Sequence, residues 1–173
     1  EDHGLMVDVN LRAPIMLTRL ALPYLRDAEG GAIINVGSLA GWQPLADQVS
    51  YSATKAGLRT FTYALFEELR GSNIKTALVS PGPLDTGFIM DNLDTVADLT
   101  MSQPISTAEE VAQAVLDLCG NRQKEIAMPA VSAWLSRFFR VFPWLKRALL
   151  PLFEAKGARV KRRLKAEREV RES

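Results

Sequence analysis

The chain has 173 residues, of which 47% are hydrophobic and 24% charged, the balance expected of one globular domain with a substantial buried core. One cysteine (Cys119) and one histidine (His3) exclude an intramolecular disulfide framework and argue against a metal centre or a His-based catalytic triad. The formal net charge of +1 is divided unevenly, because residues 1–133 carry nine Lys and Arg against 16 Asp and Glu, whereas residues 134–173 carry 12 against four.

The first predicted element is a helix over residues 5–25, in which apolar side chains recur at helical spacing. Pro23 lies inside this pattern, and we expect it to kink or end the helix because proline lacks a backbone N–H. Gly30-Gly31 then stops the helix. Residues 32–36 (AIINV) are short, apolar and β-branched, and they predict a strand buried on both faces, as in parallel sheets.

A second long helix is predicted over residues 47–69, where leucine and phenylalanine side chains mark one apolar face and Gly71 supplies a stop. Residues 74–79 predict another buried strand, which ends at Pro81-Gly82. Strand, helix and strand at this spacing form a βαβ crossover between parallel strands.

Residues 83–105 show no clear periodicity and predict a long, partly helical loop, the kind of segment that often serves as a functional lid. Overlapping capping-box patterns at Ser106 and Thr107 predict a helix that runs to about Leu118. Residues 125–128 predict a last short strand. The order of these elements predicts an α/β fold with a parallel sheet.

Three side chains give the clearest indication of chemistry. Tyr51 and Lys55 are four residues apart on the second long helix, so both lie on one helix face. An ammonium group beside a phenol favours the phenolate, and such a pair can exchange a proton with an alcohol or carbonyl oxygen. Ser38 follows a buried strand at the edge where α/β sheets place ligand sites, so its hydroxyl can hold the same oxygen. Each residue also has a structural alternative, packing for the pair and a turn cap for Ser38.

Three segments, taken in order, resemble the short-chain dehydrogenase/reductase family. They are residues 33–41 (IINVGSLAG), residues 51–57 (YSATKAG) and residues 79–86 (VSPGPLDT). The match lies in both residue type and order, and it covers roughly residues 5–130. The resemblance implies a partial Rossmann-type, doubly wound parallel sheet and hydride transfer between NAD or NADP and an alcohol or ketone.

The resemblance also implies roles for single residues. Tyr51 corresponds to the family's general acid/base, and Lys55 to the residue that makes the tyrosine proton easier to remove and binds the nicotinamide ribose. Ser38 corresponds to the substrate-orienting hydroxyl. Asn10 corresponds to the helix asparagine that holds a water in the proton relay, although its alternative is to satisfy a backbone carbonyl.

Pro81, Gly82 and Thr86 match the family's P-G-x-x-x-T segment, whose backbone and hydroxyl contact the nicotinamide carboxamide; a plain turn at Pro81-Gly82 is the alternative. The resemblance also implies that Tyr51, like Lys55, contacts the cofactor. Residues 83–105 correspond to the variable substrate-binding lid. Its apolar side chains favour a hydrophobic substrate, and they include Leu84, Phe88, Ile89 and Met90.

One feature of the family is absent from this sequence. The chain contains no G-x-G-x-x-G or T-G-x-x-x-G-x-G motif, with which the family holds the dinucleotide pyrophosphate. Since Asn10 already corresponds to the helix before the strand at residues 32–36, we expect about the first hundred residues of such a domain to be missing. We therefore expect this chain alone to be inactive. The residues that distinguish NAD from NADP lie outside it.

Residues 131–173 are expected to form an amphipathic, basic helical extension of the Rossmann-type part, residues 1–130. Trp, Phe and Leu alternate with Arg and Lys over residues 134–153, a pattern typical of short helices at a membrane surface and too charged for a membrane span. Residues 134–165 therefore predict a membrane contact, strengthened by cations near anionic lipid. An equally weighted alternative is that the aromatic side chains cap the substrate pocket or pack against another subunit.

We predict an NAD(P)-dependent oxidoreductase that acts on a hydrophobic secondary alcohol or ketone, located in the cytoplasm or peripherally at a membrane. The resemblance implies a homo-oligomer in which the two long helices pair. The alternative is a non-catalytic membrane-surface or oligomer-forming module that retains an incomplete fold. Nucleic acid is not an expected partner, because the tail has no recognisable module and the body is acidic. A serine hydrolase is excluded because Ser38 does not stand in a G-x-S-x-G motif.

Overall fold

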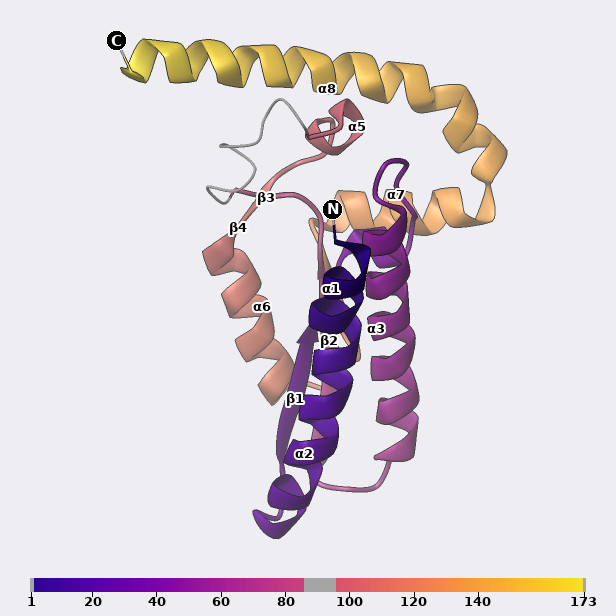
Figure 1. Ribbon diagram of the computed structural model, residues 1–173, viewed down its shortest axis with the longest axis vertical. Helices are drawn as coiled ribbons and strands as arrows, with labels where there is room; N and C mark the ends of the chain where they lie inside the picture. Colours follow the sequence, from indigo (N-terminus) through magenta and orange to yellow (C-terminus); the bar gives the residue numbers. More distant parts are fainter. Residues whose placement is uncertain (1, 86–95, 173) are drawn as a thin grey trace.

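The computed structural model describes residues 2–85 and 96–172. Helices pack around a small parallel sheet, and a long C-terminal helix crosses over one end of the molecule (Figure 1). In chain order the elements are α1 (His3–Val7), η1 (Asp8–Arg12), α2 (Ala13–Asp27), β1 (Gly31–Val36), η2 (Leu39–Gly41), α3 (Val49–Glu68), β2 (Ile74–Pro81), β3 (Leu84–Asp85), α5 (Asp98–Met101), β4 (Ser106–Thr107), α6 (Ala108–Gly120), β5 (Glu125–Met128), α7 (Ala130–Val141) and α8 (Pro143–Glu172).

The main sheet has three strands in the order β1-β2-β5, and all of them are parallel. The β1–β2 pairing begins at Gly31 opposite Ile74, and the β2–β5 pairing ends at Pro81 opposite Met128. A separate short pair joins β3 and β4. The parallel α/β sheet predicted from the sequence is confirmed, and the carboxyl ends of all three strands meet at one edge.

Helices cover both faces of the sheet, as in a doubly wound fold. On one face, α2 and α3 pack on a cluster of buried residues around Leu65 and Ile74. On the other face, Ala77 and Val79 of β2 pack against Leu118 and its neighbours on α6. Figure 1 shows α6 and the α2–α3 pair on opposite sides of β1 and β2. The central strand β2 is thus buried on both faces, which explains its continuous apolar sequence. The prediction that residues 32–36 are buried on both faces is wrong, because β1 lies at the edge of the sheet and its residues are half-buried or exposed.

Pro23 was predicted to kink or end the first helix, and it does not end it. Helical structure continues from His3 through η1 to Asp27, with Pro23 inside α2. Pro23 is exposed, so water can bond the carbonyl that its missing N–H leaves without a partner. Leu22 and Leu25, on either side of it, pack against the buried cluster on the sheet and hold the helix in place.

The other predicted boundaries lie within a few residues of the observed ones. Of the two overlapping capping boxes, the one at Thr107 forms, since Thr107 Oγ1 accepts from the Glu110 N–H and the Glu110 carboxylate accepts from the Thr107 N–H. Ser106 lies in β4 instead. The predicted loop over residues 83–105 contains β3 and α5, whereas Thr86, Phe88, Ile89 and Met90 are outside the described residues.

The C-terminal part consists of α7 and the long helix α8, which packs along α5. Gly157 of α8 passes so close to α5 that a Cβ at this position would overlap the Asp98 carbonyl. Lys161 Nζ donates to the Val96 carbonyl at 2.7 Å and lies 3.5 Å from the Asp98 carboxylate. Across the described part of the chain, every helix is too short or too polar to cross a bilayer.

Candidate active site

A cavity of about 550 Å³ lies beyond the carboxyl ends of β1 and β2. Its walls come from the loop after β1, the start of α3, the end of β2, and helices α5, α7 and α8. Ser38, Tyr51 and Gly82 all line it. Three residues that the sequence indicated separately therefore face one space, at the edge where parallel α/β sheets bind ligands.

Ser38 occupies the tight turn after β1. Its Oγ accepts a hydrogen bond from the Ala40 N–H at 3.1 Å, which caps the short helix η2. A hydroxyl that accepts in this way keeps its own proton for a further partner. Ser38 therefore does cap a turn, as its structural alternative proposed. Its hydroxyl can still donate to a ligand in the cavity that Ser38 lines.

Gly41 explains how the Ser38 turn is held against the helix that carries Tyr51. A Cβ at Gly41 would lie 2.7 Å from the Lys55 carbonyl oxygen and 2.9 Å from the carbonyl carbon. Only a residue without a side chain permits this approach between backbone segments. The turn and α3 are consequently in direct backbone contact beside the cavity.

Tyr51 and Lys55 lie on adjacent turns at the start of α3. Lys55 Nζ is 5.7 Å from the centroid of the Tyr51 ring, within the range of a cation–π contact. The same Nζ donates to the Val36 carbonyl at the end of β1, at 3.1 Å. Burial of this ammonium lowers the pKa of Lys55 below its ordinary value of 10.5. The ammonium is therefore held between the phenol ring and the carboxyl end of the sheet.

Asn10 is connected to the Tyr51 turn through one intermediate side chain. Its Nδ2 donates to Thr54 Oγ1 at 3.5 Å, and Thr54 Oγ1 donates to the Tyr51 carbonyl at 2.8 Å. Asn10 lies in η1, a single wide turn of the π type, which inserts an extra residue into an otherwise regular helix. Such turns re-aim side chains, and here the turn brings Asn10 against α3.

Pro81 and Gly82 lie where β2 ends. The Gly82 N–H donates to the Met128 carbonyl at 2.7 Å, so the strand pairing with β5 continues up to the cavity that Gly82 lines. The alternative of a plain turn does not describe Pro81, which is the last residue of the buried strand. Thr86, the third residue of this predicted segment, is outside the described residues.

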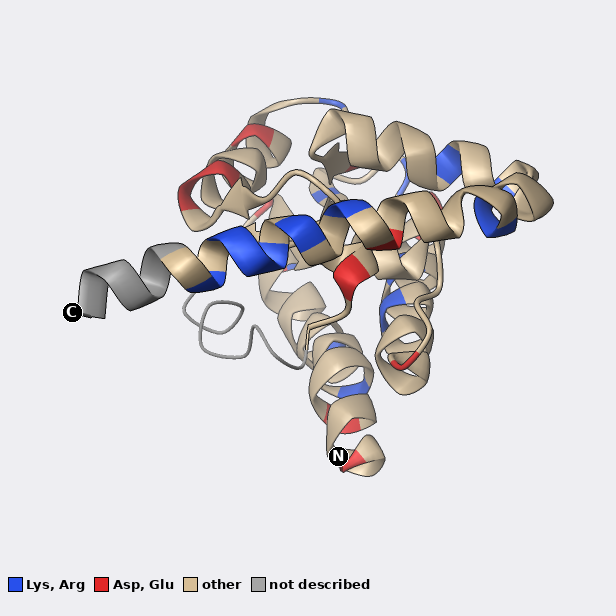
Figure 2. Cartoon of the chain, turned by 90° about the horizontal axis from the view of Figure 1, so that it is seen from above, with Lys and Arg blue, Asp and Glu red and all other residues tan. Residues whose placement is uncertain are grey.

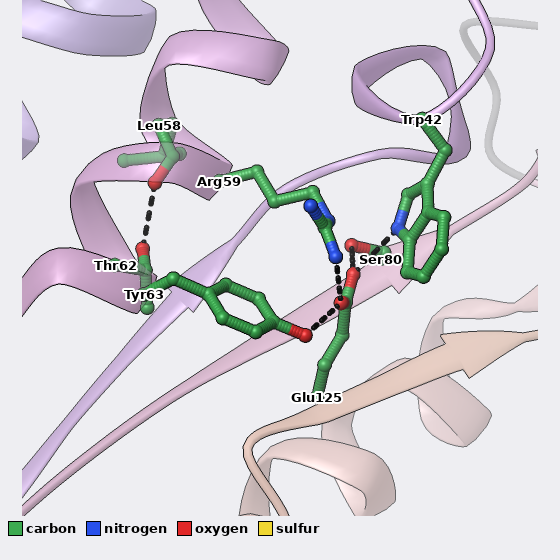
Figure 3. Close-up of polar contacts among 7 residues, drawn as sticks. All are labelled: Trp42, Leu58, Arg59, Thr62, Tyr63, Ser80 and Glu125. Atoms are coloured by element: carbon green, nitrogen blue, oxygen red, sulfur yellow. Dashed lines mark hydrogen bonds and ion pairs between the residues drawn. The ribbon is translucent and has the colours of Figure 1, made fainter. Parts of the chain in front are cut away.

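Sequence reasoning missed a buried carboxylate next to the site (Figure 3). The Glu125 side chain, on β5, is only 3% exposed and accepts four hydrogen bonds. Oε1 accepts from Trp42 Nε1 at 2.7 Å and from Ser80 Oγ at 2.5 Å. Oε2 accepts from the Arg59 guanidinium at 3.1 Å and from the Tyr63 hydroxyl at 2.7 Å. The four donors come from the loop after η2, from β2 and from α3.

Arg59 lies between two aromatic rings in this cluster. Its guanidinium carbon is 4.0 Å from the Trp42 ring centroid and 4.5 Å from that of Tyr63. Burial, together with the bond to Glu125, raises the pKa of Tyr63, so this phenol remains a donor at neutral pH. Arg59 is one turn beyond Lys55, and the cluster therefore fixes α3 against β2 and β5 close to Lys55 and Tyr51.

The residues at the cavity fit one end of a dinucleotide. A half-buried ammonium and a phenol are donors suited to a ribose, and they lie with a glycine at a strand end on one edge of the sheet. The chain has no glycine-rich motif of the kind that holds a pyrophosphate at a helix N-terminus. The fit is therefore to the nicotinamide–ribose end.

Comparison with known proteins identifies the family. The family model described as short chain dehydrogenase matches residues 1–97. The chain belongs to the short-chain dehydrogenase family. It is 38% identical over 120 residues to the ketoacyl reductase HetN of Nostoc sp. strain PCC 7120, covering 69% of this chain and 41% of HetN.

Two solved structures show the same fold over most of this chain. A short-chain dehydrogenase from Burkholderia cenocepacia in complex with NADP has a TM-score of 0.71 and 26% identity, covering 87% of this chain and 61% of that one. Serine dehydrogenase from Escherichia coli has a TM-score of 0.60 and 29% identity, covering 74% and 53%. The chain thus spans between two fifths and three fifths of the length of these relatives, and the partial Rossmann-type fold predicted from the sequence is confirmed.

Proposed function

We propose that the protein containing this chain is an NAD(P)-dependent oxidoreductase that interconverts a hydrophobic secondary alcohol and its ketone. One observation carries the proposal. Ser38 and Tyr51 line the same cavity, and the Lys55 ammonium lies against the Tyr51 ring. A hydroxyl donor, a phenol and an ammonium in this arrangement can bind an oxygen and move a proton to or from it.

Each residue has a distinct part in the proposed reaction. The Tyr51 hydroxyl gives a proton to the ketone oxygen or takes one from the alcohol, while Ser38 donates to the same oxygen and holds it in place. Lys55 stabilises the phenolate and contacts the ribose, and Asn10 orders a water that returns the proton to solvent. NAD(P), when bound, supplies or takes up the hydride. Pro81, Gly82 and Thr86 position its carboxamide.

The cavity lining supports a substrate that is mainly apolar but carries a polar group. Leu84, Leu135 and Phe139 contribute apolar walls. Among the described residues, three buried polar atoms of the lining have no hydrogen-bond partner, and buried polar groups are normally paired. They are Gln43 Oε1, Thr100 Oγ1 and Ser132 Oγ. These three atoms are shielded from the cavity, so Ser38 and Tyr51 are the groups left to bind the polar group of the substrate.

We also propose that residues 1–173 alone do not turn over NAD(P)H, because the sequence lacks the pyrophosphate-binding glycine motif. The same absence favours the second candidate, a non-catalytic module that keeps the fold. If the same reading frame encodes a glycine-rich strand–turn–helix upstream of Glu1, the oxidoreductase is favoured. If it does not, the non-catalytic module is favoured.

Self-association through the long helices is a further part of the proposal. Leu17, Leu20 and Tyr24 on α2 are all more than 60% exposed, which is unusual for large apolar side chains that follow one helix face. A second copy packed against α2 and α3 would cover them. The molar mass in solution tests this part.

The decisive experiment measures reduced-nicotinamide oxidation by the product of the full reading frame, with a panel of hydrophobic ketones. Tyr51→Phe should lower kcat by about 10²–10⁴-fold, because it removes the group that transfers the proton. Tyr63→Phe, which removes a phenol hydroxyl from the same helix but outside the cavity lining, is the matched control and should lower kcat much less than Tyr51→Phe. Full activity of Tyr51→Phe would refute the proposed chemistry, and turnover by residues 1–173 alone would refute the inactivity of the isolated chain.

A further inference from the structure

Helix α7 is apolar on two neighbouring faces, and only one of them is covered. The inner face contains Phe139, which is buried, and Leu135, and both line the cavity. On the outer face, Trp134 is 61% and Val141 69% exposed, with Phe138 between them at helical spacing. A helix that needed to contact only the protein core would carry polar residues on this outer side.

The outer side chains form one continuous surface. The Trp134 and Phe138 rings are stacked with centroids 5.3 Å apart, and the Phe138 and Phe142 centroids are 5.0 Å apart. Trp144, at the start of α8, is 66% exposed and follows directly in the chain. We call these residues the aromatic face: Trp134, Phe138, Val141, Phe142 and Trp144.

Cations surround the aromatic face. Arg140 and Arg147 are exposed within one turn of Val141 and Trp144, respectively. Arg137 is exposed as well, and its guanidinium lies 4.7 Å from the Trp42 ring. Residues 130–166 contain ten Lys and Arg and one acidic residue, Glu154. Figure 2 shows a run of basic residues along α8, with one acidic residue on the same helix and others on neighbouring elements.

We propose that the aromatic face docks onto an anionic lipid bilayer, with α7 lying in the plane of the interface. Trp and Phe rings favour the headgroup level of a membrane, and arginine guanidinium groups bind lipid phosphates. The helices of the described residues do not meet the length and hydropathy of a membrane span, which fits a helix that lies on the surface. This docking goes beyond the proposed oxidoreductase chemistry and does not depend on it.

The positive charge beside the aromatic face favours a membrane over a second copy of the chain as its binding partner. Two copies meeting through the aromatic face would bring Arg140 and Arg147 of each chain close to those of the other, and like charges in an interface are unfavourable. An anionic bilayer instead neutralises them, and each cation near such a surface favours binding.

Vesicle flotation of the 173-residue chain tests the proposal. The chain should float with vesicles of phosphatidylcholine and phosphatidylglycerol and much less with phosphatidylcholine alone. The double variant Trp134→Ser/Trp144→Ser should lower the partition coefficient by at least about tenfold. Leu116→Ser removes a side chain of similar exposure (65%) on α6 and should leave binding unchanged. Circular dichroism and the urea midpoint verify that each variant is folded.

The electrostatic part has its own variants. Arg140→Gln/Arg147→Gln should lower the partition coefficient about 25-fold, since about 1 kcal/mol per cation corresponds to about fivefold for each. Arg26→Gln/Arg122→Gln, at exposed arginines away from α7 and α8, is the control. The proposal is overturned if the chain does not float with anionic vesicles, or if the aromatic-face and control variants bind equally. It is also overturned if the wild-type chain does not bind vesicles and Trp134→Ser instead dissociates an oligomer of the chain.

Discussion

Replacing Glu125 with leucine tests whether the buried carboxylate holds α3 against the sheet. The substitution keeps a side chain of similar volume but removes the acceptor of four hydrogen bonds. Ser80 and Tyr63 can reorient their hydroxyls, whereas the Arg59 guanidinium cannot lose its charge. Arg59 would therefore remain as an unpaired cation whose side chain is only 20% exposed.

The expected loss follows from that unpaired charge. Removing one partner of a buried ion pair costs about 3–5 kcal/mol. Because some water reaches Arg59, we expect the loss in free energy of unfolding to be at the lower end of this range, about 3 kcal/mol. This figure includes the smaller cost of leaving the neutral donors without their acceptor. A protein of this size has a free energy of unfolding of about 5–15 kcal/mol, so the loss is a large part of the total. Glu125→Gln keeps one acceptor oxygen and should lose less.

Urea unfolding followed by circular dichroism measures the effect, with Glu67→Gln as the control. Glu67 also contacts two cations, Lys124 and Arg70, but it lies on the surface, where such pairs contribute little. The double variant Glu125→Leu/Arg59→Met should recover stability relative to Glu125→Leu, because it removes the stranded charge. A loss below about 1 kcal/mol for Glu125→Leu, or a double variant no more stable than the single one, would show that the ion pair does not hold the helix.

Three further predictions use the same unfolding assay. Gly41→Ala should cost about 1–3 kcal/mol, because its Cβ would press on the α3 backbone, whereas Gly120→Ala, with open space around it, should be neutral; equal effects would contradict the close approach. Thr107→Ala should cost about 1 kcal/mol by removing the cap of α6, and a neutral result would mean that the capping box contributes nothing. Because burial lowers the pKa of Lys55, the unfolded chain binds the proton more tightly. The stability of wild type relative to Lys55→Met should then rise with pH towards 10.5, and a pH-independent difference would contradict the burial of the ammonium.

The fold was largely predictable because its signals are local. Continuous apolar runs bounded by glycine marked β1 and β2, and the Thr107–Glu110 pair marked the start of α6. The predicted helix end at Pro23 did not occur, because the effect of a proline depends on its tertiary context. In an exposed turn, a missing N–H costs little when the neighbouring leucines are buried against the sheet.

The candidate site was predictable only where it follows a motif. Tyr51 and Lys55 are four residues apart, and Ser38 comes shortly after a short apolar strand. Glu125 has no such signal, since its partner Ser80 is 45 residues away and Trp42 is 83 residues away. From the sequence alone, a single glutamate in a short strand is predicted to be exposed. Its burial depends on four donors that only the folded chain brings together.

The C-terminal part shows why composition alone left two alternatives open. Burial in a pocket wall and insertion into lipid select the same side chains, so the aromatic sequence could not separate them. In the structure Leu135 and Phe139 line the cavity, whereas Trp134 and Val141 are exposed, and the membrane contact of the exposed face is our proposal. An α-helix is about 10 Å across with its side chains. If the outer face rests on lipid, the cavity therefore lies one helix width from the bilayer, a short path for the apolar substrate that its walls favour.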